Sequence, residues 1–296
     1  MTAPILPHPD PARPDRTGPG PASRAAVAPI PDGTASPLRI ATYNIRKAMG
    51  TDRRRDPARI LQVIAGLGAD VVLLQEADFR LPPRPPAIDP SEIERRTGLV
   101  PVAFGHGRAS LGWHGNALLI RPGMRLIRAG HHDLPGLEPR GFVEAELERA
   151  GQRLRVMGVH LGLLRSSRRN QLTALNGLLG PQDRLSVPTL IAGDFNERSL
   201  EVGLGRLARR FRILDGGATY HSRFPLFALD RIAMTEEFHP ERIEAFRSPE
   251  ARLASDHLPL VAELRLRAAL AQAATGTPGE GGTAGPESDG AERDPR

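Results

Sequence analysis

The sequence predicts an α/β protein in which β-sheets pack on each other and helices cover the outside. Two patterns lead to this expectation. Short apolar runs typical of strands recur along the chain, and segments with apolar residues at helical spacing separate some of them. Hydrophobic residues make up 40% of the chain, enough for a sizeable core, whereas aromatic residues make up only 4%. The core must therefore be built mainly from Val, Leu, Ile and Ala.

The first part of the folded region is predicted to be strand, helix and strand. A short apolar strand at 38–43 precedes a helix at 57–67, whose apolar residues recur at helical spacing. Gly68 is expected to end this helix. The continuous apolar run at 70–74 indicates a strand that is buried on both faces. A loop that contains five prolines follows at 79–90.

The rest of the chain adds mostly strands. A helix at 168–179 has leucines along one side, and a second helix is expected at 200–208. The remaining strands are expected at 115–120, 142–147, 154–160, 188–192, 228–234, 243–247 and 258–266. Many strands with few helices between them favour packed sheets with the helices outside.

Both ends of the chain lack an apolar period. Residues 1–36 are rich in Pro and Ala, and residues 269–296 are rich in Gly, Thr, Glu and Asp. Neither segment can bury enough apolar surface to offset its chain entropy, so we expect two disordered tails. The folded unit is then a single domain at 37–268.

The chain has a basic balance that comes almost wholly from arginine. The formal net charge is +6, the pI is about 10.8, and Lys47 is the only lysine. Arginine binds phosphate well in a bidentate manner, so the charge suits an anionic substrate. A genomic base composition that favours Arg is the simpler explanation. The arginine clusters at 53–55 and 165–169 either contact a polyanion or form solvated faces.

Composition also bounds the cellular setting. The chain contains no cysteine, which excludes disulfides and thiolate metal sites. No stretch approaches the roughly 20 apolar residues of a membrane span. The first residues lack a charged region followed by an apolar one, so no secretory signal is indicated. We expect a cytoplasmic monomer and leave peripheral membrane contact open.

Polar residues recur where the predicted strands begin or end. In sheet proteins, functional groups gather where strands give way to loops on one rim. Phosphoester hydrolysis needs a base for water, an imidazole near the phosphoryl oxygens and carboxylates for a metal. The residues at these strand ends are Asn44, Glu76, His160, Asp194, Asn196, Asp230, Asp256 and His257.

Seven short strings resemble the motif series of the endonuclease/exonuclease/phosphatase superfamily, in that family's order. They are Thr42-Tyr43-Asn44-Ile45, Leu74-Gln75-Glu76, Gly115-Asn116-Ala117, Val159-His160-Leu161, Gly193-Asp194-Phe195-Asn196, Leu229-Asp230-Arg231-Ile232 and Ser255-Asp256-His257-Leu258-Pro259-Leu260. The resemblance implies a four-layer α/β sandwich, with two mixed β-sheets packed together and helices on both outer faces. It also implies phosphoester hydrolysis with a divalent metal, usually Mg²⁺, for which Mn²⁺ can substitute.

The resemblance implies three metal ligands. Glu76 would be the main ligand with Asn44 beside it, and Asp256 would be a further ligand. A carboxylate and an amide with several waters form a ligand set that Mg²⁺ accepts.

The resemblance assigns catalytic roles to five further residues. Asp194 would orient or deprotonate the attacking water, and Asn196 would hold that water or a phosphoryl oxygen. His257 would contact the phosphoryl group, and Asp230 would accept a hydrogen bond from His257 and fix its tautomer. His160 would stand near the scissile phosphate.

The resemblance also implies that Asn116 and Arg140 hold the substrate phosphate. Several of the candidate residues also have purely structural interpretations. Asn44 could form a turn with its own backbone, Asp194 could cap a helix, and His160 could be a satisfied buried histidine.

The candidate catalytic residues do not identify the substrate. Ala77 and Asp78 stand where the exonuclease III branch usually has Thr-Lys, which argues against a dedicated abasic-site repair enzyme. One Trp and two Tyr leave little surface for stacking bases. The leading hypothesis is a phosphodiesterase, with nucleic acid as one candidate substrate. A phosphatase, a phospholipid- or inositol-phosphate-type phosphodiesterase, and a non-catalytic binding module are the alternatives.

Overall fold

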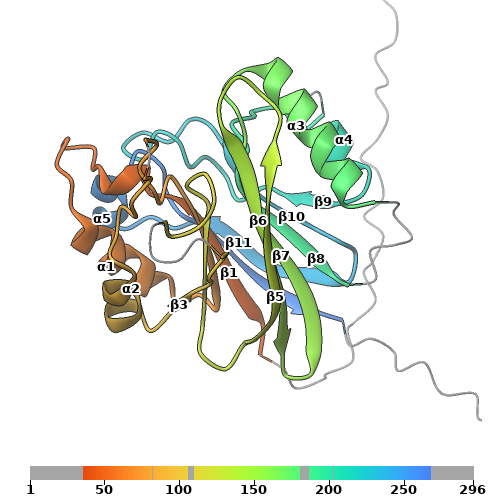
Figure 1. Ribbon diagram of the computed structural model, residues 1–296, viewed down its shortest axis with the longest axis horizontal. Helices are drawn as coiled ribbons and strands as arrows, with labels where there is room; N and C mark the ends of the chain where they lie inside the picture. Colours follow the sequence, from red (N-terminus) through yellow and green to blue (C-terminus); the bar gives the residue numbers. More distant parts are fainter. Residues whose placement is uncertain (1–35, 82, 106–109, 181–186, 202, 268–296) are drawn as a thin grey trace, which may run out of the picture. The chain divides into compact units, whose positions relative to one another are not determined.

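The computed structural model describes residues 36–81, 83–105, 110–180, 187–201 and 203–267. Apart from Ser36, the predicted tails therefore lie outside the described residues. In the described part of the chain, two six-stranded sheets pack against each other and helices cover their outer faces (Figure 1). The predicted architecture of two packed mixed sheets with helices outside is confirmed.

The first sheet brings the ends of two central strands together. Its strands are β1 (Leu38–Asn44), β2 (Val71–Gln75), β3 (Val100–Pro101), β4 (Ala117–Ile120), β11 (Phe238–Ala245) and β12 (Leu260–Leu266). Their order is β11-β12-β1-β2-β4-β3. β1 runs parallel to β2, and Asn44 pairs with Gln75. Glu76 directly follows β2, so Asn44 and Glu76 reach the same rim.

The second sheet aligns three polar residues in one row. Its strands are β5 (Arg125–Leu134), β6 (Arg140–Arg149), β7 (Gln152–His160), β8 (Thr189–Asp194), β9 (Arg212–Leu214) and β10 (Asp230–Met234). Their order is β5-β6-β7-β8-β10-β9. The register pairs His160 with Asp194 across parallel strands, and Asp230 with Asp194 across antiparallel strands. The backbone pairing therefore places these three side chains next to one another.

The central strands are apolar along their whole length because both of their faces are buried. Leu73 of β2 packs between the sheets in one cluster with Leu190 of β8, whereas Val72 packs in the cluster on the opposite face. The sheets approach closely at Gly158, where an added Cβ atom would lie 2.8 Å from the Leu73 side chain. A continuous apolar run such as 71–74 is the expected sequence of such a strand.

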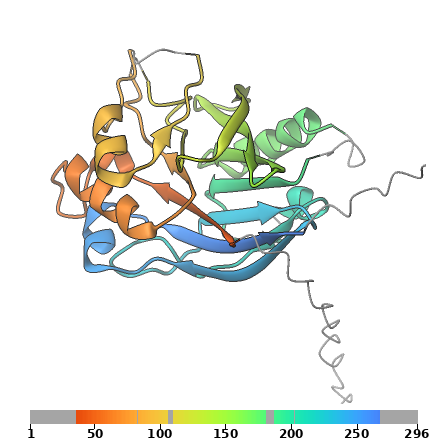
Figure 2. The same ribbon diagram turned by 90° about the horizontal axis from the view of Figure 1, so that it is seen from below.

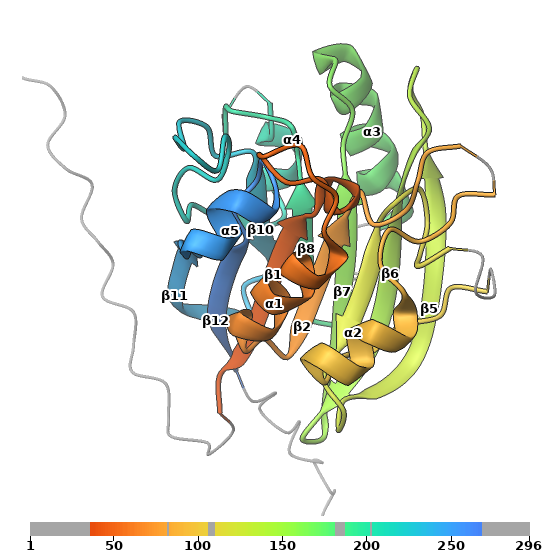
Figure 3. The ribbon, with the colours of Figure 1, turned by 90° about the vertical axis from the view of Figure 1, so that its left-hand side faces the viewer.

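The helices form the two outer layers. They are α1 (Pro57–Leu67), α2 (Pro90–Thr97), α3 (Arg165–Leu178), α4 (Gly205–Ala208) and α5 (Pro249–Ala254), with a short 3₁₀ turn η1 (Arg46–Ala48) after β1. α1, α2 and α5 pack on the first sheet, and α3 and α4 pack on the second. Figure 3 shows α1 and α5 in front of β1 and β12, and Figure 2 shows the two helical layers on opposite sides of the strands.

The predicted start and end of α1 are confirmed. Asp56 caps the helix by accepting a hydrogen bond from the backbone of Arg59, and Gly68 ends it in the left-handed conformation at φ 58°.

In the described part of the chain, no helix has both the length and the apolar composition that crossing a membrane requires.

Five elements were not expected from the sequence: β3, α2, β5, β9 and α5. They lack the apolar pattern on which sequence prediction depends. β5 lies at the edge of its sheet and buries only Leu134 of its ten residues. α2 buries only Ile93. Such elements are held by neighbouring structure rather than by their own periodicity.

Three predicted elements have a limit that differs by three or more residues in the structure. The helix expected at 168–179 begins earlier, at Arg165, and the helix expected at 200–208 is confined to Gly205–Ala208. The strand expected at 243–247 was placed too late, because β11 runs from Phe238 to Ala245. The pairing of β11 shifts register between Pro240 and Arg242, which explains why no simple alternation marks its first half.

Candidate active site

Polar side chains from both sheets meet around Asp194 at the end of β8. Oδ2 of Asp194 accepts a hydrogen bond of 3.0 Å from Nδ2 of Asn44. The Nε2 atoms of His160 and His257 lie 3.5 Å and 3.7 Å from the same oxygen. All four side chains are buried. The structure therefore brings together residues that the sequence separates widely.

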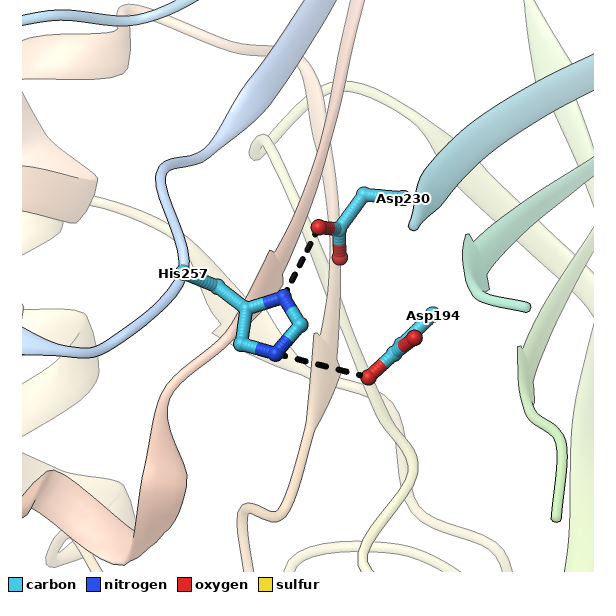
Figure 4. A group of neighbouring side chains, drawn as sticks. All are labelled: Asp194, Asp230 and His257. Atoms are coloured by element: carbon cyan, nitrogen blue, oxygen red, sulfur yellow. Dashed lines mark hydrogen bonds and ion pairs between the residues drawn. The ribbon is translucent and has the colours of Figure 1, made fainter. Parts of the chain in front are cut away.

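His257 lies between two carboxylates (Figure 4). Its Nδ1 is 2.8 Å from Oδ2 of Asp230, and its Nε2 faces Asp194. The hydroxyl of Thr219 donates a hydrogen bond of 2.6 Å to the same Asp230 oxygen. A carboxylate on Nδ1 fixes the orientation of the ring and leaves Nε2 directed at Asp194.

The electrostatic environment separates the protonation states of these groups. Burial lowers the pKa of His257, but the Asp230 and Asp194 carboxylates outweigh it and raise the pKa to about 9. Burial raises the pKa of Asp194 to about 6, although the positive charge of His257 opposes the change. At neutral pH the arrangement is therefore an imidazolium between two carboxylates.

His160 is neutral, whereas His257 is protonated. Burial, followed by the charge of Arg140, keeps the pKa of His160 well below its ordinary value. Nη1 of Arg140 donates to Nδ1 of His160 at 2.9 Å, so the proton of the neutral ring is on Nε2, which faces Asp194. Glu138 accepts hydrogen bonds of 3.1 Å and 2.7 Å from Arg140 and holds it in place.

Asn196 lies next to Asp194 and supports its loop. The backbone N–H of Asn196 donates to Oδ1 of Asp194 at 2.9 Å, and its side-chain amide donates to the carbonyl of Leu161 at 2.9 Å. In the described part of the chain no helix begins at these residues, because the next one, α4, begins at Gly205. The helix-capping interpretation of Asp194 is therefore wrong.

Asn116 makes its hydrogen bonds to the backbone. It is fully buried, and its Nδ2 donates to the backbone carbonyls of Trp113 and Gly141 at 3.2 Å and 2.9 Å. These bonds tie the turn before β4 to the start of β6. In the described part of the chain Asn116 forms no hydrogen bond with Asp194, and its expected contact with a substrate phosphate stays a prediction.

The three predicted metal ligands lie on the first-sheet side of the site, next to cationic side chains. Glu76 forms an ion pair with Lys47, and Asp256 lies 3.3 Å from Nε of Arg46. Burial lowers the pKa of Lys47 to about 8, and the Asp256 carboxylate acts against that change. The Lys47 ammonium thus interacts with both carboxylates.

This donor set fits a divalent metal ion. Two carboxylates and the amide oxygen of Asn44 are hard oxygen ligands, which suit Mg²⁺ and Mn²⁺. In the structure, Lys47 and Arg46 provide the positive charges next to the Glu76 and Asp256 carboxylates.

Asp194, Asp230 and His257 also have ligand atoms within 4.8 Å of one another. A metal in this group would have to replace the proton of an imidazole whose pKa is raised to about 9. The imidazolium already offsets one of the two carboxylate charges in this group. We therefore favour Glu76 and Asp256 as the metal-binding side.

Sequence reasoning missed three residues that shape the site: Lys47, Thr219 and Glu138. Lys47 carried a signal, since it is the only lysine in the chain and lies two residues after the end of the Asn44 motif. Thr219 and Glu138 lie in loops, where no periodicity shows which residue faces the site.

A comparison with protein-family models now adds independent information. The model of the endonuclease/exonuclease/phosphatase family matches residues 41–257, which include every site residue discussed above. The chain belongs to the endonuclease/exonuclease/phosphatase family. Members of this family are generally hydrolases that act on phosphoesters, and they depend on divalent metal ions.

Solved structures of this family share the fold at low sequence identity. An endonuclease/exonuclease/phosphatase from Beutenbergia cavernae is 22% identical, with a TM-score of 0.59 over 78% of this chain and 72% of the other. A mannosyl-6-phosphatase from Bacteroides thetaiotaomicron is 17% identical, with a TM-score of 0.62 over 77% of this chain and 100% of the other.

D. rerio TDP2, solved with a single-strand DNA product, is 17% identical, with a TM-score of 0.57 over 78% of this chain and 100% of the other. A search of curated proteins finds no match. The endonuclease/exonuclease/phosphatase fold is therefore shared by relatives of different specificity.

Proposed function

We propose that this protein is a divalent-metal-dependent phosphoester hydrolase, and specifically a phosphodiesterase. The observation that carries the proposal is the convergence of Asn44, His160 and His257 on one oxygen of Asp194. A buried carboxylate with a raised pKa, an imidazolium and a neutral imidazole in contact form an acid–base site rather than a structural ion pair.

Asp194 is the base in this proposal. Its pKa of about 6 lets it remain ionised at neutral pH and still accept a proton from water. The Asn44 amide and the Asn196 backbone each hold one of its oxygens, which fixes the direction in which it accepts.

His257 is the acid in this proposal. As an imidazolium it stabilises the charge that develops on the phosphoryl oxygens or protonates the departing group. Asp230 keeps the ring charged and oriented through the contact on Nδ1. The neutral His160, fixed by Arg140, supplies a second N–H donor beside the scissile phosphate. Asn196 and Asn116 are proposed to assist, the former at the attacking water and the latter at the substrate phosphate.

Glu76, Asn44 and Asp256 are the residues that would hold the metal ion, Mg²⁺ with Mn²⁺ as a substitute. When bound, such an ion polarises a phosphoryl oxygen and lowers the pKa of coordinated water. The protein's own task at this position is to keep two carboxylates and an amide oxygen on one side of the site.

A phosphomonoesterase is the second candidate, and the mannosyl-6-phosphatase among the structural neighbours motivates it. The neighbour solved with a single-strand DNA product motivates nucleic acid as a substrate of the first candidate. We also propose, from composition alone, that the protein acts as a cytoplasmic monomer with residues 37–268 as its catalytic domain.

A substrate panel tests the proposal. Wild-type protein, Asp194→Asn and the surface control Glu92→Gln would be assayed on plasmid DNA, single-stranded DNA, RNA, bis-p-nitrophenyl phosphate, p-nitrophenyl phosphate and a phospholipid. Mg²⁺-dependent turnover that EDTA and Asp194→Asn abolish, and that Glu92→Gln retains, is expected. Turnover that survives in Asp194→Asn would contradict the proposed mechanism, and turnover of only the monoester would favour the phosphatase.

A further inference from the structure

A cavity of about 210 Å³ opens beside the proposed catalytic centre. It is lined by residues of several elements, among them Lys47 and Glu76 on one side and Arg140 and His160 on the other. His160 faces Asp194 at 3.5 Å, so a group in the cavity would lie directly next to the reacting phosphoester.

The charges that line this cavity do not cancel. Each of its carboxylates already has partners: Glu76 pairs with Lys47, and Glu138 pairs with Arg140. Asp78 accepts from the hydroxyl of Ser110 at 2.7 Å and from the backbone of Leu111. The two remaining cations of the lining, Arg80 and Arg84, have no carboxylate partner among the described residues.

Arg84 is held in place by a neutral partner. Its Nη1 lies 3.0 Å from Nδ1 of His114, and Nε2 of His114 lies 2.9 Å from Asp133. Burial is the main cause that lowers the pKa of His114, so the ring is neutral, donates to Asp133 and accepts from Arg84. The arrangement orients the guanidinium without an ion pair, and Arg80 and Arg84 together carry one positive charge more than the neighbouring Asp78 offsets.

Arg80 directs its charge at the same cavity. Burial is the main cause that lowers the pKa values of Lys47, Arg140 and His160, and the Arg80 guanidinium adds to the lowering in all three. Arg80 itself is exposed, so an incoming anion can reach it.

We propose that this cavity binds a second phosphate of the substrate, with Arg84 and Arg80 as its ligands. The inference rests on the proposed function, because it places the scissile phosphate at Asp194 and His257. Phe79, Leu137 and Pro139 give the cavity an apolar side against which the organic part between the two phosphates packs. The substrate class is a phosphoester that carries another phosphate close to the scissile one.

Two matched esters test the preference by turnover. The substrates are thymidine 5′-(p-nitrophenyl phosphate) and the same ester with an added 3′-phosphate. Wild type should have a kcat/KM at least about 10-fold higher for the ester with the second phosphate, since one charge-assisted contact contributes a factor of that order. In Arg84→Gln, and in Arg80→Gln to a smaller extent, the ratio between the two esters should fall towards one.

Arg153→Gln is the matched control, because Arg153 is an exposed arginine at the opposite end of β7 from His160. It removes the same charge and should leave the ratio unchanged. An equal loss of ratio in Arg153→Gln would show that overall charge is responsible and would overturn the inference. A ratio of one in the wild type, or a ratio that persists in Arg84→Gln, would overturn it too.

Binding to the inactive Asp194→Asn variant separates this inference from the proposed function. Calorimetry would compare thymidine 3′,5′-bisphosphate with thymidine 5′-monophosphate, and glucose 1,6-bisphosphate with glucose 6-phosphate. Tighter binding of either bisphosphate, lost when Arg84→Gln is added, supports the subsite and shows whether the second phosphate belongs to a nucleotide or to a small sugar. Equal binding within both pairs overturns the subsite. If bisphosphates bind in this way but wild type hydrolyses nothing, the proposed function fails and the subsite stands.

Discussion

The carboxylate of Asp230, at the start of β10 in the second sheet, contacts Nδ1 of His257, in the loop before β12 of the first sheet, at 2.8 Å. This contact holds the imidazole between Asp230 and Asp194 and raises the pKa of His257 to about 9. The proposed chemistry depends on it, because an unpaired buried histidine would lose its proton at neutral pH.

The pH dependence of turnover should show both groups of the pair. Asp194 must be ionised, so the rate should rise with pH through about 6. His257 must be protonated, so the rate should fall as pH increases through about 9. A kcat profile from pH 4.5 to 10.5 on bis-p-nitrophenyl phosphate measures both limbs.

Asp230→Asn should move the alkaline limb of that profile to lower pH. The substitution removes the carboxylate that raises the His257 pKa most and retains a similar shape. The acidic limb should remain near that of the wild type or move lower, because Asp230 also raises the pKa of Asp194. An alkaline limb at the same pH in both proteins would mean that His257 is not the titrating acid.

His257→Gln should lower kcat by about 10²- to 10⁴-fold, the usual contribution of a positioned acid or base. Its circular dichroism spectrum should match that of the wild type, because glutamine retains a polar group toward Asp230. A kcat within threefold of wild type, measured in the same preparation, would remove His257 from the mechanism.

Lys47→Gln should strengthen metal binding. The ion pair with Glu76 places an ammonium at the carboxylate that we assign to the metal, and the ion must displace it. Removing that competing charge should lower the Kd for Mn²⁺ by about 10-fold, measured by electron paramagnetic resonance of free Mn²⁺. Weaker binding in the variant would place the metal away from Glu76.

Gly158→Val should destabilise the fold. A Cβ atom at this position would lie 2.8 Å from Leu73 of the other sheet and 3.1 Å from Val143. Overpacking of this kind costs about 1–3 kcal/mol, to be measured by urea denaturation. The double variant Gly158→Val/Leu73→Ala should recover part of the loss, and the absence of any recovery would show that the two side chains do not compete for space.

Much of the architecture could be predicted from the sequence because the central strands are buried on both faces. Apolar runs such as 71–74 mark those strands without ambiguity. β5 could not be found, because its exposed edge residues alternate in no regular way. Two short motifs marked Asp194 and His257 as candidate site residues, and the structure places both in one buried group.

The contacts around those residues could not be predicted in the same way. Nothing in the sequence shows that Thr219 donates to Asp230, or that His114 orients Arg84. Both contacts depend on how loops fold back over the rim. The hydrogen bonds of Asn116 to the backbone of Trp113 and Gly141 likewise depend on the turn before β4, which no pattern reveals.

The two sheets contribute different halves of the proposed catalytic site. Asn44 and His257 belong to one sheet or its loops, whereas Asp194 and Asp230 belong to the other, and the bonds between the halves are 3.0 Å and 2.8 Å long. A slide of one sheet over the other by a single ångström would break both bonds before any strand came apart. Catalysis should therefore be lost before the fold unfolds when the apolar interior loosens. Turnover should report the alignment of the two sheets more sensitively than a melting temperature does.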